Sequence, residues 1–520
     1  MSKKSTDNLF ELIQSLTKSE KRYFKLLSSR HTIGEENNYI ILFDYIEKIE
    51  EYDEKLLFEH FKGQAFLNRF SITKKRLYDH ILAALDTFYA NSSLDAQLYK
   101  SLHSADILYN KSLYDQCRRV LKSAEKQAFK NQRFAILLEI SKRQKKLFET
   151  NGYSEFEQSD MDSINTNDSR SLDNLQQFSK LWRLKSELFI ELSRHGVSRS
   201  NDHKNVFDSI QKELNSISKG KLLSIENEYL LNHSNSAYYY AVRDFEKCMN
   251  YLSKNISLLE ENQNYLIEHP NSYFSILTNG IYVNEQLGNY SQANELLQKL
   301  KTFPQKYAIE LSEDLQIKLF SSTSSIEISL YTVRGDFNAA IKLIPLFENG
   351  IRLYGDKISP QRKAFLEFKF AAALIGANDY NGALKWVNAI LNDSKLEITE
   401  DIIAFTHLLD LIIHLELKHD QLLPYALKST ERFLKSRNIL HNFEKVMLRF
   451  INKLVKSKDI FENESIWQEL HQELSELKLD THQNVGLEYF DFESWAKSKI
   501  KRIPFEEIIR LKFSENKFCA

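Results

Sequence analysis

The chain has 520 residues, and its 70 Lys and Arg residues almost balance its 71 Asp and Glu residues, which leaves a formal net charge of -1. No global field therefore draws the chain to nucleic acid or to an anionic membrane. It contains only 13 glycines and 6 prolines among its 520 residues, whereas glycine and proline together make up roughly 12% of ordinary proteins. Because β sandwiches, barrels and propellers need many turns, they need more of these two residues than the chain has. The composition predicts an all-α fold.

Length and cysteine content narrow the class further. One hydrophobic core rarely supports more than about 300 residues, so the chain needs several domains or a stack that grows in one direction. The longest apolar stretch, Leu408 to Leu417, is interrupted by charged and polar residues and is too short for a membrane span. Three distant cysteines exclude a disulfide framework and a Cys-based zinc site. We expect a cytoplasmic protein that needs no cofactor.

The first 92 residues predict a compact helical unit. Asp7 is placed to cap a helix whose apolar residues begin at Leu9 and recur at helical spacing. Thr17 and Glu20 form a capping box that opens a second helix. Further helices are expected over about 39–49, 53–62 and 73–89.

Cations gather near both ends of the chain, where residues 1–30 and 494–520 each hold seven basic and three acidic side chains. Lys18, Lys21, Arg22 and Lys25 share one face of the second helix. The helices at 53–62 and 73–89 are also a candidate helix-turn-helix whose possible nucleic-acid contacts are Arg69, Lys74, Lys75 and Arg76. The break between the two helices is long for that motif, so a solvated basic face is the favoured interpretation.

One pattern recurs along the rest of the chain: a short polar turn, an aromatic residue, a small residue three positions later and an aliphatic residue seven positions later. From Phe245 onward the aromatic residues are 45, 47 and 43 residues apart, which indicates an internal repeat. A small residue at this spacing lets a second helix press closely against the first. Each repeat is therefore predicted to be a helical hairpin, and neighbouring hairpins must stack to bury their faces. The aromatic positions are Tyr114, Phe245, Tyr290, Phe337 and Tyr380.

The turn-Tyr/Phe-x-x-Ala pattern resembles the second half of the tetratricopeptide repeat, most strongly at 288–297, 335–344 and 378–387. The segments LTKSEKRYFKLL (16–27) and YFDFESWAKSKI (489–500) also resemble bacterial repeat proteins of unknown function. The resemblance implies an α-solenoid of stacked helical hairpins with a repeat of about 45 residues, longer than the 34 residues of the tetratricopeptide repeat. It also implies a concave groove that binds a protein or peptide and is lined by His233, Thr278, Tyr282, Glu285, Ser325, Ser329 and Lys369.

The expected domain organisation follows these signals. Residues 1–92 form the N-terminal unit, 93–158 the first hairpins and 174–480 the repeat stack, and 481–520 form a basic C-terminal cap. Between them, residues 159–173 are rich in Ser, Asn and Asp, which predicts an exposed polar loop.

Sequence motifs for binding a phosphate group or a metal ion are weak. The glycines are too far apart to cradle a phosphate, and the acidic stretch at 160–171 lacks the bidentate Glu of a calcium loop. His407, Asp410 and His414 share one helix face and could hold a metal, although a narrow polar stripe facing water is the favoured interpretation.

The sequence thus predicts a non-enzymatic scaffold that presents a long surface to a protein or peptide. The alternative is a DNA-binding transcription regulator whose repeats sense a peptide.

Overall fold

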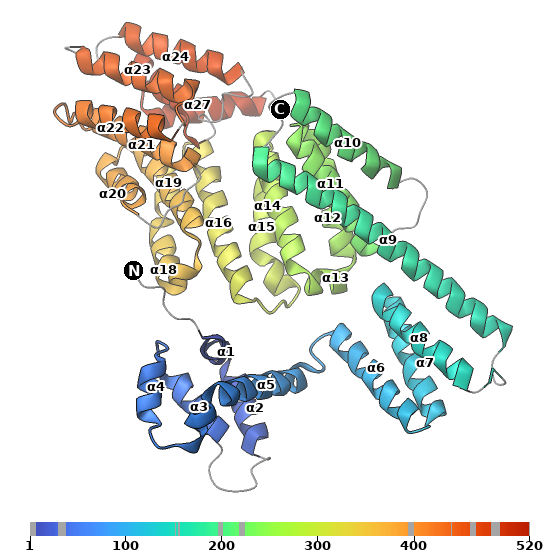
Figure 1. Cartoon of the computed structure of the whole chain (residues 1–520). Helices are drawn as coiled ribbons and strands as arrows, with labels where there is room; N and C mark the ends of the chain where they lie inside the picture. The colour runs from blue at the N-terminus through green and yellow to red at the C-terminus, as the bar shows by residue number, and fades with distance from the viewer. Residues whose placement is uncertain are drawn as a thin grey trace. The chain divides into compact units, whose positions relative to one another are not determined.

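The computed structural model describes residues 7–29, 38–150, 152–153, 157–195, 201–217, 224–393, 400–437, 439–457, 464–479 and 489–518. Within these ranges the chain forms helices and turns and no β-strand, which confirms the all-α prediction (Figure 1). The chain divides into two compact units, residues 1–176 and 177–520. None of the described helices is both long and apolar enough to span a bilayer.

The first unit opens with a cluster of short helices around its own apolar core, which includes Ile13, Phe24 and Leu77. Asp7 caps the first helix, since its carboxylate accepts hydrogen bonds from the amides of Leu9 and Phe10. The capping box also forms: the amide of Thr17 donates to Glu20, and the amide of Glu20 donates to the Thr17 hydroxyl. The helices are α1 (Asn8–Ser15), α2 (Lys18–Ser29), α3 (Asn38–Lys48), α4 (Glu54–His60), the 3-10 helix η1 (Ala65–Arg69) and α5 (Phe70–Tyr89).

A second apolar core in this unit joins α6 (Leu94–Asn110), α7 (Tyr114–Lys130) and α8 (Phe134–Thr150). The predicted polar loop at 159–173 is wrong, because this segment lies inside one long helix, α9 (Gln158–His195). Tertiary contacts outweigh its poor helix propensity. The Asn167 amide donates to Glu125 at 3.2 Å, and Lys145 pairs with Asp168 at 2.5 Å.

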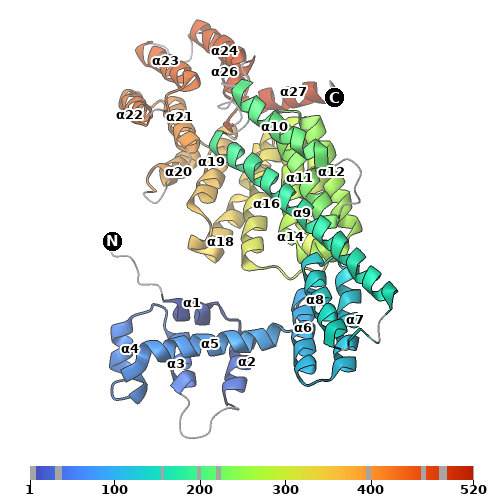
Figure 2. The same cartoon turned by 45° about the vertical axis from the view of Figure 1, so that its right-hand side comes forward.

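The second unit continues from α9 through a succession of helices that pack in neighbouring pairs (Figure 2). Its apolar interior consists of two clusters, one built from residues 181–330 and one from residues 328–509. The helices are α10 (Asn201–Ile217), α11 (Ile225–Ala241), α12 (Phe245–Glu261), α13 (Gln263–Glu268), α14 (Pro270–Gln286), α15 (Tyr290–Lys306), α16 (Glu313–Val333), α17 (Phe337–Ile341), α18 (Ile344–Tyr354), η2 (Gly355–Lys357), α19 (Pro360–Gly376), α20 (Tyr380–Leu391), α21 (Glu400–Glu416), α22 (Leu423–Ser436), α23 (Asn442–Lys456), α24 (Glu464–Leu479), α26 (Phe492–Lys501) and α27 (Phe505–Phe518).

The predicted hairpins correspond to helix pairs with one common turn. In each pair the motif aromatic is the first residue of the second helix, and the small residue three positions later is buried. The residue two positions before the aromatic has a positive φ, from 61° at Ser112 to 74° at Gly335. The next amide then bonds back to the first helix, as from Asp379 to the Leu374 carbonyl at 2.9 Å. This is the bond that ends a helix through a left-handed residue.

One pair departs from the pattern. The helix that begins at Phe337 ends at Ile341, and a separate helix, α18, starts at Ile344 with Pro345 in its first turn. Proline has no amide hydrogen to continue a helix but suits a helix start. The motif aliphatic Ile344 is consequently half-buried, whereas its counterpart Val387 is fully buried.

The C-terminal helix α27 lies across the turns of two of these pairs. The ring of Phe505 stacks on Phe337 with centroids 5.5 Å apart, and Phe513 lies 5.1 Å from Tyr290. Gly335 makes this approach possible, because a Cβ there would lie 2.9 Å from the Glu506 carbonyl oxygen. The C-terminal segment is therefore part of the core of the second unit.

Candidate binding face

All seven predicted groove residues lie on the first helices of successive pairs: α11, α14, α16 and α19. These helices contact one another in series. Tyr240 of α11 and Tyr282 of α14 lie 5.9 Å apart between ring centroids, α14 packs on α16, and α16 packs on α19. We call the surface shared by these four helices the binding face.

A cavity with a volume of about 590 Å³ lies along this face and is called the His233 cavity. It lies among α9, α11, α12 and α14, and three of the predicted residues line it: His233, Thr278 and Tyr282. Tyr282 is 37% exposed and His233 only 8%. The remaining lining residues are Phe189, Leu192, Ser236, Ala237, Tyr240, Cys248, Leu252, Asn279 and Val283.

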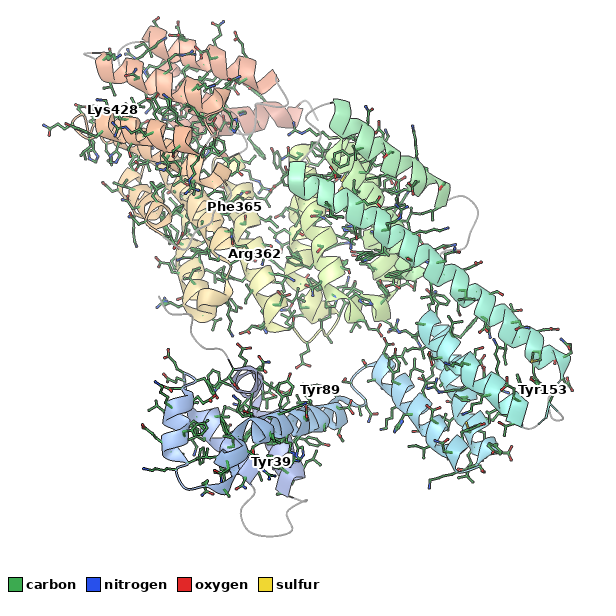
Figure 3. The ribbon with its side chains drawn as sticks, viewed as in Figure 1. Tyr39, Tyr89, Tyr153, Arg362, Phe365 and Lys428 are labelled. Carbon is green, nitrogen blue, oxygen red and sulfur yellow. The ribbon has the colours of Figure 1, made fainter. Side chains whose placement is uncertain are left out.

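A smaller cavity of about 220 Å³, the Arg362 cavity, follows along the face. Thr278 lines this cavity as well as the His233 cavity, so the two adjoin. Ser325 is the other predicted residue here, and Arg362 and Phe365 of α19 form the opposite wall (Figure 3).

The third cavity, the Lys369 cavity, has a volume of about 280 Å³. Two predicted residues line it, and they bond to each other, since the Lys369 ammonium donates to the Ser329 hydroxyl. The ammonium also lies 4.9 Å from the centre of the Phe365 ring. The C-terminal segment closes this cavity with Tyr489, Phe490, Asp491, Phe505, Ile509, Lys512 and Phe513.

Glu285 is the seventh predicted residue, near the end of α14. Its Oε1 atom is buried and accepts no hydrogen bond from the described residues. Burial raises the pKa of Glu285 to about 7, and the nearby Lys369 lowers it only in part. Burial likewise lowers the pKa of Lys369, which Glu285 partly offsets. The two groups form a weakly compensated, half-buried pair, which is costly unless something else stabilises it.

Sequence reasoning missed the walls opposite the first helices. Phe189 and Leu192 come from α9, and Tyr489 to Asp491 precede α26. These residues are far in sequence from most of the residues they approach, and the repeat pattern does not include them. The aromatic character of Phe189, Tyr489 and Phe490 was the available signal.

The four N-terminal cations do not form a single basic surface. Arg69, Lys75 and Arg76 are exposed, but Lys74 is bound within the first unit by Asp7 and by the Tyr52 hydroxyl at 3.0 Å. Burial opposes its charge, yet these two hydrogen bonds raise the pKa of Lys74. The cationic face of α2 is also partly paired, because Lys25 lies 2.7 Å from Glu47 and 2.8 Å from Asp44 of α3.

The predicted polar stripe on α21 is only partly exposed to solvent. His407 is half-buried against the Phe433 ring, 4.6 Å away, and burial lowers its pKa to about 4. Asp410 and His414 are each 15% exposed and lie 3.6 Å apart. Among the residues that the structure describes, no three His, Cys, Asp or Glu side chains gather as a metal ion would require.

No family model, curated protein or solved structure matches the chain. The proposed function therefore depends on this geometry.

Proposed function

We propose that the second unit is an α-solenoid of stacked hairpins and a non-enzymatic scaffold that binds an extended segment of a partner protein along α11, α14, α16 and α19. One observation carries the proposal: the successive first helices share a face on which the His233 and Arg362 cavities adjoin through Thr278. Adjoining cavities of this kind can hold consecutive side chains of a bound peptide.

The polar character of the face supports binding of protein rather than lipid. Thr278, Ser325 and Ser329 are half-buried hydroxyl residues, and such groups give orientation and specificity to contacts that apolar walls make favourable. The buried free thiols of Cys117 and Cys248 agree with a reducing compartment such as the cytoplasm.

The test uses the full chain in its native cells. A photo-crosslinking residue at Ser325 should capture a partner, and the same residue at Lys428, exposed on α22 (Figure 3), is the control position. Capture at Ser325 should be abolished by Thr278→Arg, which fills the junction of two cavities. Equal capture at both positions, or capture that Thr278→Arg leaves unchanged, would contradict the proposal.

The transcription-regulator alternative has its own measurement. Duplex DNA retarded at low salt, with retardation lost in a Lys75→Glu, Arg76→Glu chain, would favour it. Lys74 is unsuitable for this test because its replacement breaks the pair with Asp7.

A further inference from the structure

The Arg362 cavity has a lining with one charge and no counter-charge. Its walls come from α16 and α19, with Thr278 of α14 beside them, and Arg362 and Phe365 project from α19 (Figure 3). No Asp, Glu or Lys is among the described residues that line it. Its volume of about 220 Å³ is below the range of about 300–1,000 Å³ that is typical of sites for whole small molecules. The cavity therefore suits one side chain of a larger ligand.

The guanidinium of Arg362 has no partner of opposite charge. It is exposed and forms no ion pair with any residue that the structure describes. The three lysines of the same two helices all have partners: Lys318 pairs with Asp314, Lys363 lies 3.8 Å from Glu367, and Lys369 donates to Ser329. Arg362 is thus the basic side chain of α16 and α19 whose charge is left for a ligand.

Hydroxyl groups line the same cavity. Those of Thr278 and Ser321 donate to carbonyls of their own helices, at 3.0 Å and 2.8 Å. Ser322 and Ser325 are half-buried, and their hydroxyls form no hydrogen bond with other residues in the described part of the chain. A hydroxyl can donate its proton to an anion. The lining therefore offers a ligand the guanidinium of Arg362 and two uncommitted O–H donors.

We propose that the Arg362 cavity holds the carboxylate of an Asp or Glu side chain of the partner segment, an inference that rests on the proposed function. A guanidinium and a carboxylate pair through two parallel hydrogen bonds. The hydroxyls of Ser322 and Ser325 donate to the lone pairs that remain. The methylene groups of the acidic side chain lie against the apolar part of the wall, which includes Phe365 and Leu366.

The charge of the lining selects this occupant. A neutral side chain gains nothing from the charge of Arg362, and a Lys or Arg side chain is repelled by it. A phosphorylated side chain carries nearly two negative charges, and proteins bind such groups with clusters of arginines. A single arginine lines this cavity, which matches the single charge of a carboxylate.

The first experiment compares two probes of nearly equal shape on the full chain. Binding of N-acetyl-glutamate α-amide and of N-acetyl-glutaminamide is measured by saturation-transfer difference NMR. The acidic probe should bind about threefold to tenfold more tightly, between the values of an exposed ion pair and a buried charged hydrogen bond. In Arg362→Gln the two probes should bind equally. Arg432→Gln, the same change at an exposed arginine of α22, should keep the preference.

Equal binding of the two probes to the wild-type chain, or a preference that survives in Arg362→Gln, would overturn the proposal. A charge reversal guards against misfolding, because it should create a new selectivity rather than remove one. Arg362→Glu, with an unchanged circular dichroism spectrum, should bind N-acetyl-lysinamide more tightly than the acidic probe. A folded Arg362→Glu chain that still prefers the acidic probe would also overturn the proposal.

Partner capture at Ser325 separates this inference from the proposed function. Capture should be lost in Arg362→Glu and kept in Arg432→Glu. Capture that persists in Arg362→Glu would overturn the carboxylate and leave the proposed function standing. Capture from a cell lysate that is lost after phosphatase treatment would identify the anion as a phosphoryl group and likewise overturn it. A preference for the acidic probe without any capture at Ser325 would instead remove the proposed function, and with it the partner segment as the source of the carboxylate.

Discussion

Helices α11 and α23, of 17 and 15 residues, use burial in different ways. In α23 the buried side is almost entirely apolar, with residues such as Phe443, Met447 and Phe450. In α11 burial extends all round the helix, and an unbroken run from Asn232 to Ser236 is polar. Apolar burial stabilises a fold directly, whereas buried polar groups contribute specificity and add to stability only when they are paired. Burial in α23 therefore mainly stabilises the second unit, whereas burial in α11 also encloses a run of polar side chains.

The largest effect is expected in α23. Phe450 is 4% exposed and lies 4.9 Å from the Trp467 ring. Phe450→Ala should lower the free energy of unfolding of the second unit by about 3–5 kcal/mol, because it deletes a buried ring and leaves a cavity. Urea denaturation followed by tryptophan fluorescence measures this loss. The exposed Lys445→Ala is the control on the same helix, and an equal loss from both variants would show that burial of the Phe450 ring is not what stabilises α23.

Glu285 should make the free energy of unfolding of the second unit depend on pH. Its pKa in the folded chain, about 7, lies above the ordinary value of 4.5, so folding disfavours the carboxylate. The resulting penalty is absent below about pH 4.5, grows as pH rises and is complete above pH 7. Glu285→Gln should stabilise the second unit by about 3 kcal/mol at pH 8.5 and hardly at all at pH 4.5.

The matched control for this prediction is Glu295→Gln, an exposed carboxylate on α15. It should not change the free energy of unfolding at either pH. A gain from Glu285→Gln that is the same at both pH values would show that the charge of Glu285 is not what the fold disfavours.

His233→Phe should stabilise the chain, in contrast to Phe450→Ala. Removing the unpaired buried nitrogen should raise the free energy of unfolding by about 1–2 kcal/mol at pH 7. Because the pKa of His233 falls from 6.5 to about 4 on folding, the wild type loses stability as pH falls through this interval, whereas the variant does not. The difference between the two melting temperatures should therefore widen at pH 5. A variant less stable than the wild type would show that the imidazole of His233 stabilises the fold.

The smallest effect is expected at Ser234, a neighbour of His233 that is fully buried. Its hydroxyl donates to the Leu230 carbonyl of its own helix at 2.8 Å. Since this group is already satisfied locally, Ser234→Ala should change the free energy of unfolding by less than about 0.5 kcal/mol. A larger loss, measured in the same denaturation series, would mean that the whole polar run of α11 is structural.

Much of this fold was predictable because its signals are local. The capping box at Thr17 and Glu20 and the turns before Tyr290 and Tyr380 depend on residues close in sequence, and the helices begin where these signals place them. The polar loop at 159–173 was mispredicted for the opposite reason. Residues more distant in sequence, such as Lys145 and Glu125, contact that segment in the folded chain. The residues near the segment give no sign of these contacts.

The candidate site was predictable only on one side. A repeat register places residues such as Thr278 and Ser325 on the first helices, which is where they lie. The register contains no information about α9 or the segment before α26, so the walls supplied by Phe189 and Tyr489 required the tertiary structure. Nor could spacing show that the His233 ring stacks on two aromatic rings, because one of these rings is Phe189 of α9.

Helix α27 bears on how the chain is made. A ribosome releases the turns before Tyr290 and Phe337 long before it releases Phe505 and Phe513, which cover them. Both aromatic side chains must therefore wait uncovered during synthesis, when exposed apolar surface invites aggregation. A nascent polypeptide stalled upstream of Phe505 would therefore leave the Tyr290 and Phe337 side chains without these two ring contacts.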